Sequence, residues 1–308
     1  MFYRTLRAVF VALSLGVSAL PLLPTPGSRV MSAERDKMKH PAENVDESKY
    51  IKNLPDDFEF PVDRAGQLLL REYGAVYVAR NGVKRPKKVF FESEAEVMSF
   101  QSSLDIQREQ IGSIYLELQK PAMRALEKAI KEANKQGLSI SPRGADSGRR
   151  GYNQTIELWK SRVEPGLTYW VGRKRLQAPK AGEIRKLPIR QQITEILGLE
   201  QEGIFFAKSL DKSIIYSVAP PGSSQHIAML ALDVKEFDDP RVREILAEHG
   251  WFQTVKSDLP HFTYLGVDES KLPSLGLAKV VVGDRHFWVP DLSAGTPNIL
   301  PNGKKRPN

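Results

Sequence analysis

The sequence predicts a fold that mixes amphipathic α-helices with antiparallel β-hairpins, and three local patterns support this. Apolar runs lie on both sides of tight-turn pairs at Asn81-Gly82 and Gly283-Asp284, as in hairpins. Ser93, with a glutamate three residues on, is typical of a helix N-terminus. An apolar stripe at helical spacing follows Pro121. The 308 residues, 41% of them hydrophobic, can bury the core of one or two domains.

Composition narrows the chemistry that the chain can use. Cysteine is absent, which excludes disulfides, thiolate metal sites, a cysteine nucleophile and a lipid-modified cysteine. Any metal must therefore bind through His, Asp or Glu. The formal net charge of +8 favours an anionic neighbourhood, which nucleic acid, anionic lipid or an anionic wall polymer would each provide. Charge alone does not choose among these partners.

The first residues have the pattern of a secretory signal peptide. Arg4 and Arg7 precede an apolar run over residues 8–20, which prolines close. The run is shorter than the roughly 20 residues that a membrane-spanning helix needs. We therefore expect an exported protein of the periplasm or cell envelope, and an uncleaved N-terminal membrane anchor is the alternative. Export makes a wall or membrane surface a better partner for the basic charge than nucleic acid.

The chain divides into five predicted segments. Residues 1–33 should be the signal peptide and the start of a tether, and the polar residues 34–57 a disordered tether. Residues 58–115 should form an N-terminal hairpin and helix region. The main domain should occupy residues 116–292 and end in the second hairpin, and the Pro/Gly/Lys-rich residues 293–308 should form a disordered tail.

Within these segments the individual elements can be assigned. Residues 75–78 and 89–91 should pair as the first hairpin, and a helix should begin near Glu94. Pro121 suits the first turn of a second helix, which Gly137 stops. The remaining elements are expected, in chain order, as a strand at 138–140, a helix at 189–197, strands at 213–218 and 229–234 separated by a turn at 220–222, and a helix at 240–249.

Two of the five histidines lie where a metal could be bound. His226 leads into the apolar strand that carries Asp233, and His261 follows Asp258 in a largely apolar stretch. A carboxylate in an apolar strand is costly unless a cation or metal pairs with it. Two imidazoles and one carboxylate make a three-ligand zinc site with a fourth position for water. From spacing alone, ordinary hydrogen bonding is the commoner explanation.

The residues around His226 resemble a known zinc motif. Residues 224–233, Ser-Gln-His-Ile-Ala-Met-Leu-Ala-Leu-Asp, resemble the SxHxxGxAxD motif of the zinc D-alanyl-D-alanine carboxypeptidases of the vancomycin-resistance type, a family that includes L-alanyl-D-glutamate endopeptidases. The family's downstream ExxH motif is matched by Asp258-Leu259-Pro260-His261, and its upstream SGYR motif by Ser147-Gly148-Arg149-Arg150. The resemblance covers residues 116–266.

This resemblance implies an α+β fold like that of the hedgehog and lysostaphin group, in which an antiparallel sheet carries the zinc and helices flank it. The Zn²⁺ ligands would be His226, Asp233 and His261. Asp258 would replace the glutamate that acts as general base. Arg150 would bind the substrate carboxylate or the developing oxyanion, and Ser224 would also lie in the substrate site.

Departures from the family pattern leave the activity open. Met229 replaces a glycine, on the face expected to carry Asp233, and Asp258 is one methylene shorter than glutamate. Gly151 and Thr155 stand where serine and glutamine are usual.

Two hypotheses follow from the resemblance. One is an exported zinc metallopeptidase that hydrolyses peptide bonds of peptidoglycan, as a D-Ala-D-Ala carboxypeptidase or a related endopeptidase. The other is a catalytically impaired protein of the same fold that binds cell-wall peptides. We expect a monomer. Nucleic-acid binding through basic residues 173–190 is disfavoured because the signal peptide opposes it.

Overall fold

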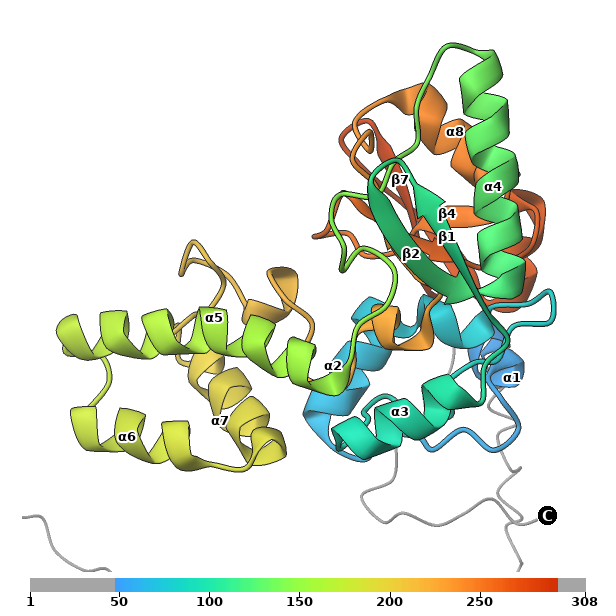
Figure 1. Ribbon diagram of the computed structural model, residues 1–308. Helices are drawn as coiled ribbons and strands as arrows, with labels where there is room; N and C mark the ends of the chain where they lie inside the picture. Colours follow the sequence, from blue (N-terminus) through green and yellow to red (C-terminus); the bar gives the residue numbers. More distant parts are fainter. Residues whose placement is uncertain (1–47, 293–308) are drawn as a thin grey trace, which may run out of the picture. The chain divides into compact units, whose positions relative to one another are not determined.

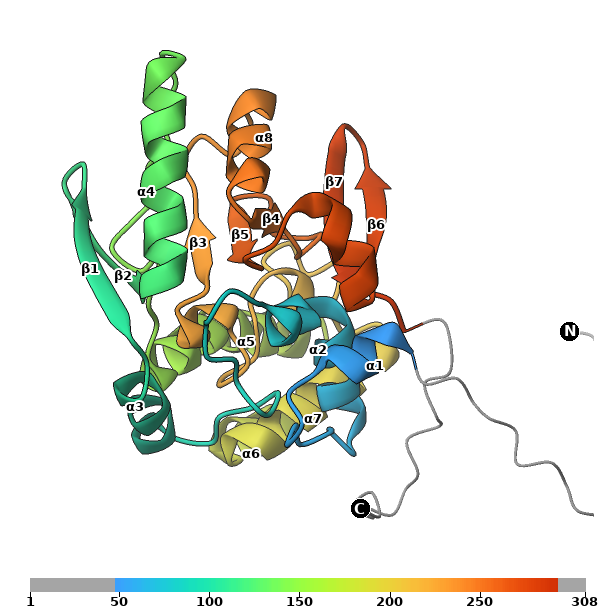
Figure 2. The same ribbon diagram turned by 90° about the vertical axis from the view of Figure 1, so that its right-hand side faces the viewer.

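The computed structural model of the chain describes residues 48–292, in which helices and short antiparallel strands are mixed (Figures 1 and 2). The predicted α+β class is therefore confirmed. The predicted signal peptide, the tether up to residue 47 and the C-terminal tail lie outside the described residues. Within residues 48–292 no helix is both long and apolar enough to cross a membrane.

A three-stranded antiparallel sheet lies at the centre of the region that matters for function. Its strands run in the order β3 (Ala231–Asp233), β5 (His261–Tyr264) and β4 (Trp251–Gln253). Asp233 is paired directly with His261 across β3 and β5. Opposite residues project to the same face of a sheet, so this register brings two of the predicted ligands together.

Two helices pack beside this sheet. α4 (Lys120–Lys135) contacts α8 (Pro240–Glu248), which in turn contacts β4, and Figure 2 shows the two helices side by side. Pro121 lies in the first turn of α4, as predicted. The apolar stripe is also confirmed, because Ala122, Leu126, Ala129 and Ala133 are buried.

Two further hairpins flank the central sheet. β6 (Leu277–Val282) and β7 (Arg285–Pro290) form the predicted C-terminal hairpin. β1 (Ile106–Ile111) and β2 (Ile114–Gln119) form a hairpin that we did not predict. Its two-residue turn begins with Gly112 at φ 62°, and Gly-Ser is a known hairpin signal, so the sequence did contain the information.

The predicted first hairpin is wrong. Residues Gly74–Val78 form a short 3-10 helix, η1, and residues 89–91 belong to no strand. Asn81 and Gly82 do adopt the positive φ angles expected of them. The residues on either side of this turn do not form a hairpin. The amide of Arg80, just before the turn, donates to the carbonyl of Leu265 instead.

Of three other predicted strands, two are absent from the structure and one is shorter than predicted. Residues 138–140 are not a strand, and residues 213–218 contain the 3-10 helix η2 (Ile214–Tyr216). The strand predicted at 229–234 is shortened to β3, because Met229 lies outside it. Apolar runs as short as these do not show a clear period, so the sequence alone cannot tell them apart from strands.

Part of the predicted tether is folded. Residues 48–57, assigned to a tether, contain α1 (Lys49–Asn53). Tyr50 on this helix is fully buried, and its hydroxyl donates to the carbonyl of Gly74 at 2.8 Å. α2 (Arg64–Tyr73) and α3 (Glu94–Ser102) follow, the latter capped by Ser93 as predicted. Residues from this region share one hydrophobic core with the rest of residues 48–292.

The segment without a predicted role is helical. α5 (Tyr152–Gly172), α6 (Ala178–Lys186) and α7 (Ile189–Gln201) pack on one another, as Figure 1 shows. α7 confirms the helix predicted at 189–197. A hydrogen bond joins α5 to α7: the indole N–H of Trp159 donates to the side-chain oxygen of Gln192 at 2.9 Å.

Candidate metal centre

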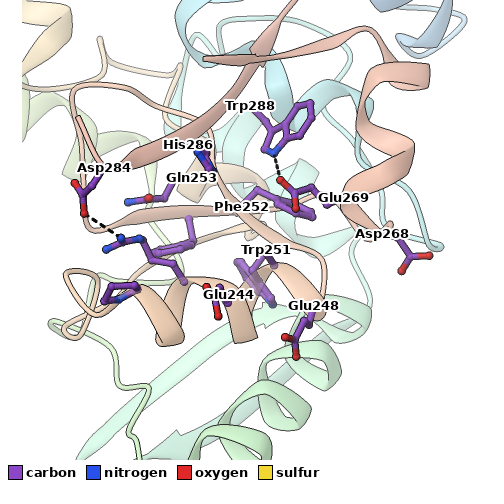
Figure 3. Close-up of a pocket in the computed structure, with 14 residues that line it drawn as sticks. Glu244, Glu248, Trp251, Phe252, Gln253, Asp268, Glu269, Asp284, His286 and Trp288 are labelled. Carbon is purple, nitrogen blue, oxygen red and sulfur yellow. Dashed lines mark hydrogen bonds and ion pairs between the residues drawn. The ribbon is translucent and has the colours of Figure 1, made fainter. Parts of the chain in front are cut away.

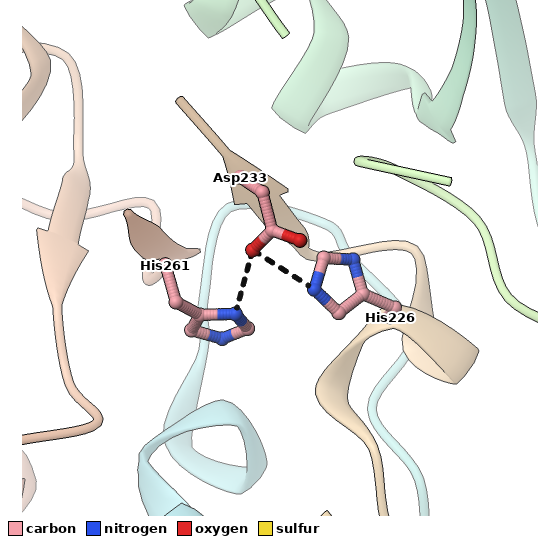
Figure 4. Close-up of side chains that lie close together, drawn as sticks. All are labelled: His226, Asp233 and His261. Atoms are coloured by element: carbon pink, nitrogen blue, oxygen red, sulfur yellow. Dashed lines mark hydrogen bonds and ion pairs between the residues drawn. The ribbon is translucent and has the colours of Figure 1, made fainter. Parts of the chain in front are cut away.

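Among residues 48–292, His226, Asp233 and His261 form a group that could hold a metal ion (Figure 4). Each offers one ligand atom, and these atoms lie within 4.8 Å of one another. His226 Nε2 and His261 Nδ1 are each 3.3 Å from Asp233 Oδ1. Both imidazoles are buried, and the aspartate side chain is 15% exposed. The structure thus brings the three predicted ligands together.

A short 3-10 helix places the first ligand. η3 (Gln225–Ala228) is capped by Ser224, whose hydroxyl accepts from the amide of His226. The helix ends at Met229, which has a left-handed backbone with φ 55°, and β3 begins two residues later. The prediction that Met229 shares a strand face with Asp233 is therefore wrong. Ser224 is buried and serves as a helix cap.

The tautomer of His226 follows from one contact. Its Nδ1 lies 3.1 Å from the carbonyl oxygen of Gly148. A carbonyl only accepts, so Nδ1 must donate and Nε2 keeps its lone pair. Nε2 is buried and has no hydrogen-bond partner among the described residues. A buried polar atom without a partner is costly, and a metal ion would satisfy it.

Gly148 has a packing reason to be glycine. A Cβ added there would lie 2.9 Å from the carbonyl oxygen of Glu117 and 2.7 Å from the side chain of Leu116. Gly148 lies in the loop between α4 and α5, and this loop can approach β2 so closely only because position 148 has no side chain. This close approach also brings the Gly148 carbonyl to His226.

The two kinds of ligand have the protonation states that a metal requires. Burial lowers the pKa of His226, although the charge of Asp233 opposes the shift. Burial alone would raise the pKa of Asp233, but its interactions with the two neighbouring imidazoles outweigh burial and hold that pKa well below its usual range. A neutral imidazole beside an ionised carboxylate needs no proton loss before binding a metal.

Arg150 holds the other oxygen of the aspartate. Its Nη2 is 2.8 Å from Asp233 Oδ2 and 3.6 Å from Asp146. The Asp233 carboxylate is thus divided, with Oδ2 on the guanidinium and Oδ1 between the imidazoles. Within residues 48–292, the buried Nε of Arg150 has no hydrogen-bond partner. One donor beside the centre therefore lacks an acceptor among the described residues.

Asp258 does not belong to the group of three. Its side chain is exposed, and its carbonyl accepts from the amide of His261. Its negative charge acts on Tyr73: burial, followed by Asp258 and Glu72, raises the pKa of the tyrosine hydroxyl. The structure thus places Asp258 on the turn before β5, near Tyr73.

A hollow of about 510 Å³ lies elsewhere, between α8, β4 and the C-terminal hairpin (Figure 3). None of the three candidate ligands lines it. Its lining includes Trp251, Trp288 and several carboxylates. Most of these are paired: Glu244 and Glu248 contact Arg241, Asp284 contacts Arg243, and Glu269 contacts Lys279. The hollow therefore shows no clear charge preference.

Comparison with known proteins gives distant likenesses. The sequence matches no family model and no curated protein. Among solved structures, it is similar to a mutant of the vancomycin-resistance D,D-pentapeptidase VanY, from a VanB-type resistance cassette, in complex with Zn(II). That match has 15% identity and a TM-score of 0.32, and covers 54% of this chain and 82% of the other.

A second solved structure is the LD-carboxypeptidase LdcB, whose structure concerns peptidoglycan recognition. It matches at 17% identity and a TM-score of 0.30, over 56% of this chain and 70% of the other. At such TM-scores neither likeness supports a conclusion about this chain, so the site must be judged on its own geometry.

Proposed function

We propose that the chain is a zinc-dependent peptidase that hydrolyses peptide bonds of peptidoglycan, as a D-Ala-D-Ala carboxypeptidase or a related endopeptidase. The main support for this proposal is that His226 Nε2, Asp233 Oδ1 and His261 Nδ1 lie close together. Of these atoms, His226 Nε2 is buried and has no hydrogen-bond partner among the described residues. These residues also occupy the ligand positions of the family motif that the sequence resembles.

Two of the three separations between the donor atoms match the distances expected around zinc, and all three atoms lie within 4.8 Å of one another. Two donors that each lie roughly 2.0–2.1 Å from a zinc ion in tetrahedral geometry are about 3.3–3.4 Å apart. The separations of Asp233 Oδ1 from His226 Nε2 and from His261 Nδ1 are both 3.3 Å. Two neutral nitrogens and one carboxylate are the donor set of catalytic rather than structural zinc sites. A zinc ion held here would supply Lewis acidity for hydrolysis.

The chain's own groups would have two tasks beside the metal. Arg150 fixes the Asp233 carboxylate, and its guanidinium is the candidate group for binding a carboxylate or carbonyl oxygen of a peptide. Asp258, three residues before His261, is the candidate general base. We also propose that the protein is exported to the cell envelope, which the N-terminal sequence supports.

One observation favours a second candidate function. The exposed carboxylate of Asp258 is not part of the group of ligand atoms, so a proton acceptor at the metal is not assured. A protein with the metal but without turnover would bind wall peptides only.

Mass spectrometry of purified peptidoglycan incubated with the zinc-loaded protein tests the proposal. We expect shortened or cleaved stem peptides with the wild type and none with His226→Ala, which should also lose bound zinc. His249→Ala, at the end of α8, is the matched control and should retain both metal and products. Unchanged peptidoglycan together with one bound zinc per chain would support the binding-only candidate instead.

A further inference from the structure

Gln225 is a buried residue whose side-chain amide contacts the candidate ligand His261 on the side that faces away from Asp233. It precedes His226 on η3 and is 2% exposed. Its Oε1 lies 2.9 Å from Nε2 of His261, the ring nitrogen that faces away from Asp233. Its Nε2 lies 2.7 Å from the carbonyl oxygen of Tyr73. One side chain thus joins a candidate ligand to the main chain at the end of α2.

The orientation of this amide is fixed by its partners. The Tyr73 carbonyl can only accept, so the NH₂ group of Gln225 must face it and Oε1 must face His261. The hydroxyl of Thr263 also donates to Oε1, and Thr254 contacts the same hydroxyl at 2.6 Å. A flipped amide would set its oxygen against the Tyr73 carbonyl, so that contact would be lost.

We infer that Gln225 is a positioning residue that holds the proton of His261 on Nε2 and so directs the Nδ1 lone pair into the metal centre. His226 has the opposite arrangement, with its proton on Nδ1 at the Gly148 carbonyl. The two imidazoles therefore present different nitrogens to the metal. η3 supplies both one ligand and the residue that orients the other.

The alternative proton position shows why the amide matters. Asp233 Oδ1, 3.3 Å from Nδ1 of His261, would accept a proton there and occupy the lone pair that the metal needs. Without an acceptor at Nε2, that arrangement is favoured. Groups that orient metal-binding histidines in this way typically contribute roughly 10- to 100-fold to metal affinity.

Zinc affinity, measured by competition with a chelator, is the first test. Gln225→Leu should bind zinc roughly 10- to 100-fold more weakly than wild type. Gln192→Leu is the matched control: Gln192 is also buried, accepts from a ring N–H of Trp159 and donates to the carbonyl of Ile184. It should lose comparable folding stability but keep wild-type zinc affinity. Gln225→Glu retains an acceptor for His261 and should bind zinc more tightly than Gln225→Leu.

Nitrogen NMR of the zinc-loaded wild type is the second test, and it requires no variant to fold. His261 should show a protonated Nε2 and a metal-bound Nδ1, and His226 the reverse. Metal on Nε2 of His261, equal zinc affinity in Gln225→Leu and wild type, or no zinc binding at all would each overturn the inference.

The inference rests on the metal centre of the proposed function and not on hydrolysis. Zinc binding that depends on Gln225 without any peptide cleavage would overturn the proposed function and leave this inference intact. Peptide cleavage together with a zinc affinity that does not depend on Gln225 would overturn this inference and leave the proposed function intact.

Discussion

Met229 combines a left-handed backbone, φ 55°, with a fully buried side chain. A non-glycine residue in this conformation costs roughly 1–2 kcal/mol. The motif that the sequence resembles has glycine at this position, and glycine adopts a positive φ angle without steric cost. In this chain the cost is offset by burying the thioether side chain.

The first prediction weighs these two effects at Met229. Met229→Ala should destabilise the fold by about 2–5 kcal/mol, because it leaves a cavity and relieves no backbone strain. Met229→Gly should be less destabilising than the alanine variant by about 1 kcal/mol, because glycine tolerates this conformation. Urea unfolding of both variants measures the difference. A glycine variant clearly less stable than the alanine variant would contradict the assigned conformation.

The second prediction concerns Asp258. If it is the general base, Asp258→Ala should keep its zinc and lose about 10²–10⁴-fold in hydrolysis of wall peptides. Asp258→Glu, which introduces the glutamate of the motif that the sequence resembles, should remain active. Asp268→Ala, at another exposed aspartate, is the control and should be neutral. Equal rates for wild type and Asp258→Ala would remove Asp258 from the mechanism.

At the residue scale, the resemblance to a known zinc motif was enough to find the group, but not its supporting contacts. His226, Asp233 and His261 were selected from the sequence, and the structure brings them together. Gln225 was part of the same motif, yet its task depends on a carbonyl 152 residues away. Contacts over such separations leave no local pattern in the sequence.

At the scale of elements, helices with a proline in the first turn and a clear apolar stripe were predicted well, as α4 and α8 show. Buried 3-10 segments were mistaken for strands. In η1, Ala75, Val76, Tyr77 and Val78 are all buried, so no face is left to show a period. The three residues of β3 are likewise too short to alternate recognisably.

The third prediction belongs to the C-terminal turn of α7. Glu200 is buried, and its carboxylate accepts from the amides of Phe206 and Ile214 and from the hydroxyl of Ser213. Burial raises its pKa, although these hydrogen bonds oppose the shift. The folded state then holds the proton more tightly than the unfolded chain does. This contribution to stability is therefore present below the ordinary pKa and is lost as pH rises through the raised one.

Glu200→Gln removes this dependence. A glutamine can accept from both amides and donate to Ser213, so the contacts survive without the buried charge. The stability of wild type relative to the variant should fall as pH rises from about 4 to 7. Urea unfolding across that range measures it, with the exposed Glu202→Gln as control. A constant difference between wild type and Glu200→Gln would refute the assignment.

At the scale of the whole molecule, the metal would link folding to zinc concentration. A ligand present at 100 times its dissociation constant stabilises the folded state by about 2.7 kcal/mol. For a protein of this size that corresponds to a rise in melting temperature of roughly 5–10 °C. The fourth prediction is that zinc produces this rise, and that it is absent in His261→Ala. Calorimetry with and without a chelator measures it.

The pairing of Asp233 with His261 has a dynamic consequence. β3 has three residues, lies at the edge of its sheet and pairs only with β5 among the strands of residues 48–292. On its other side the main chain of Asp233 is bonded to Arg143 and Ser147, which belong to a loop. A strand of three residues can open locally without unfolding of the rest. A zinc ion bound to both residues would fasten the two strands, so opening would also require metal release. Amide hydrogen exchange at Val234 and Tyr264 should therefore slow when zinc binds, whereas exchange in α5, α6 and α7 should stay unchanged.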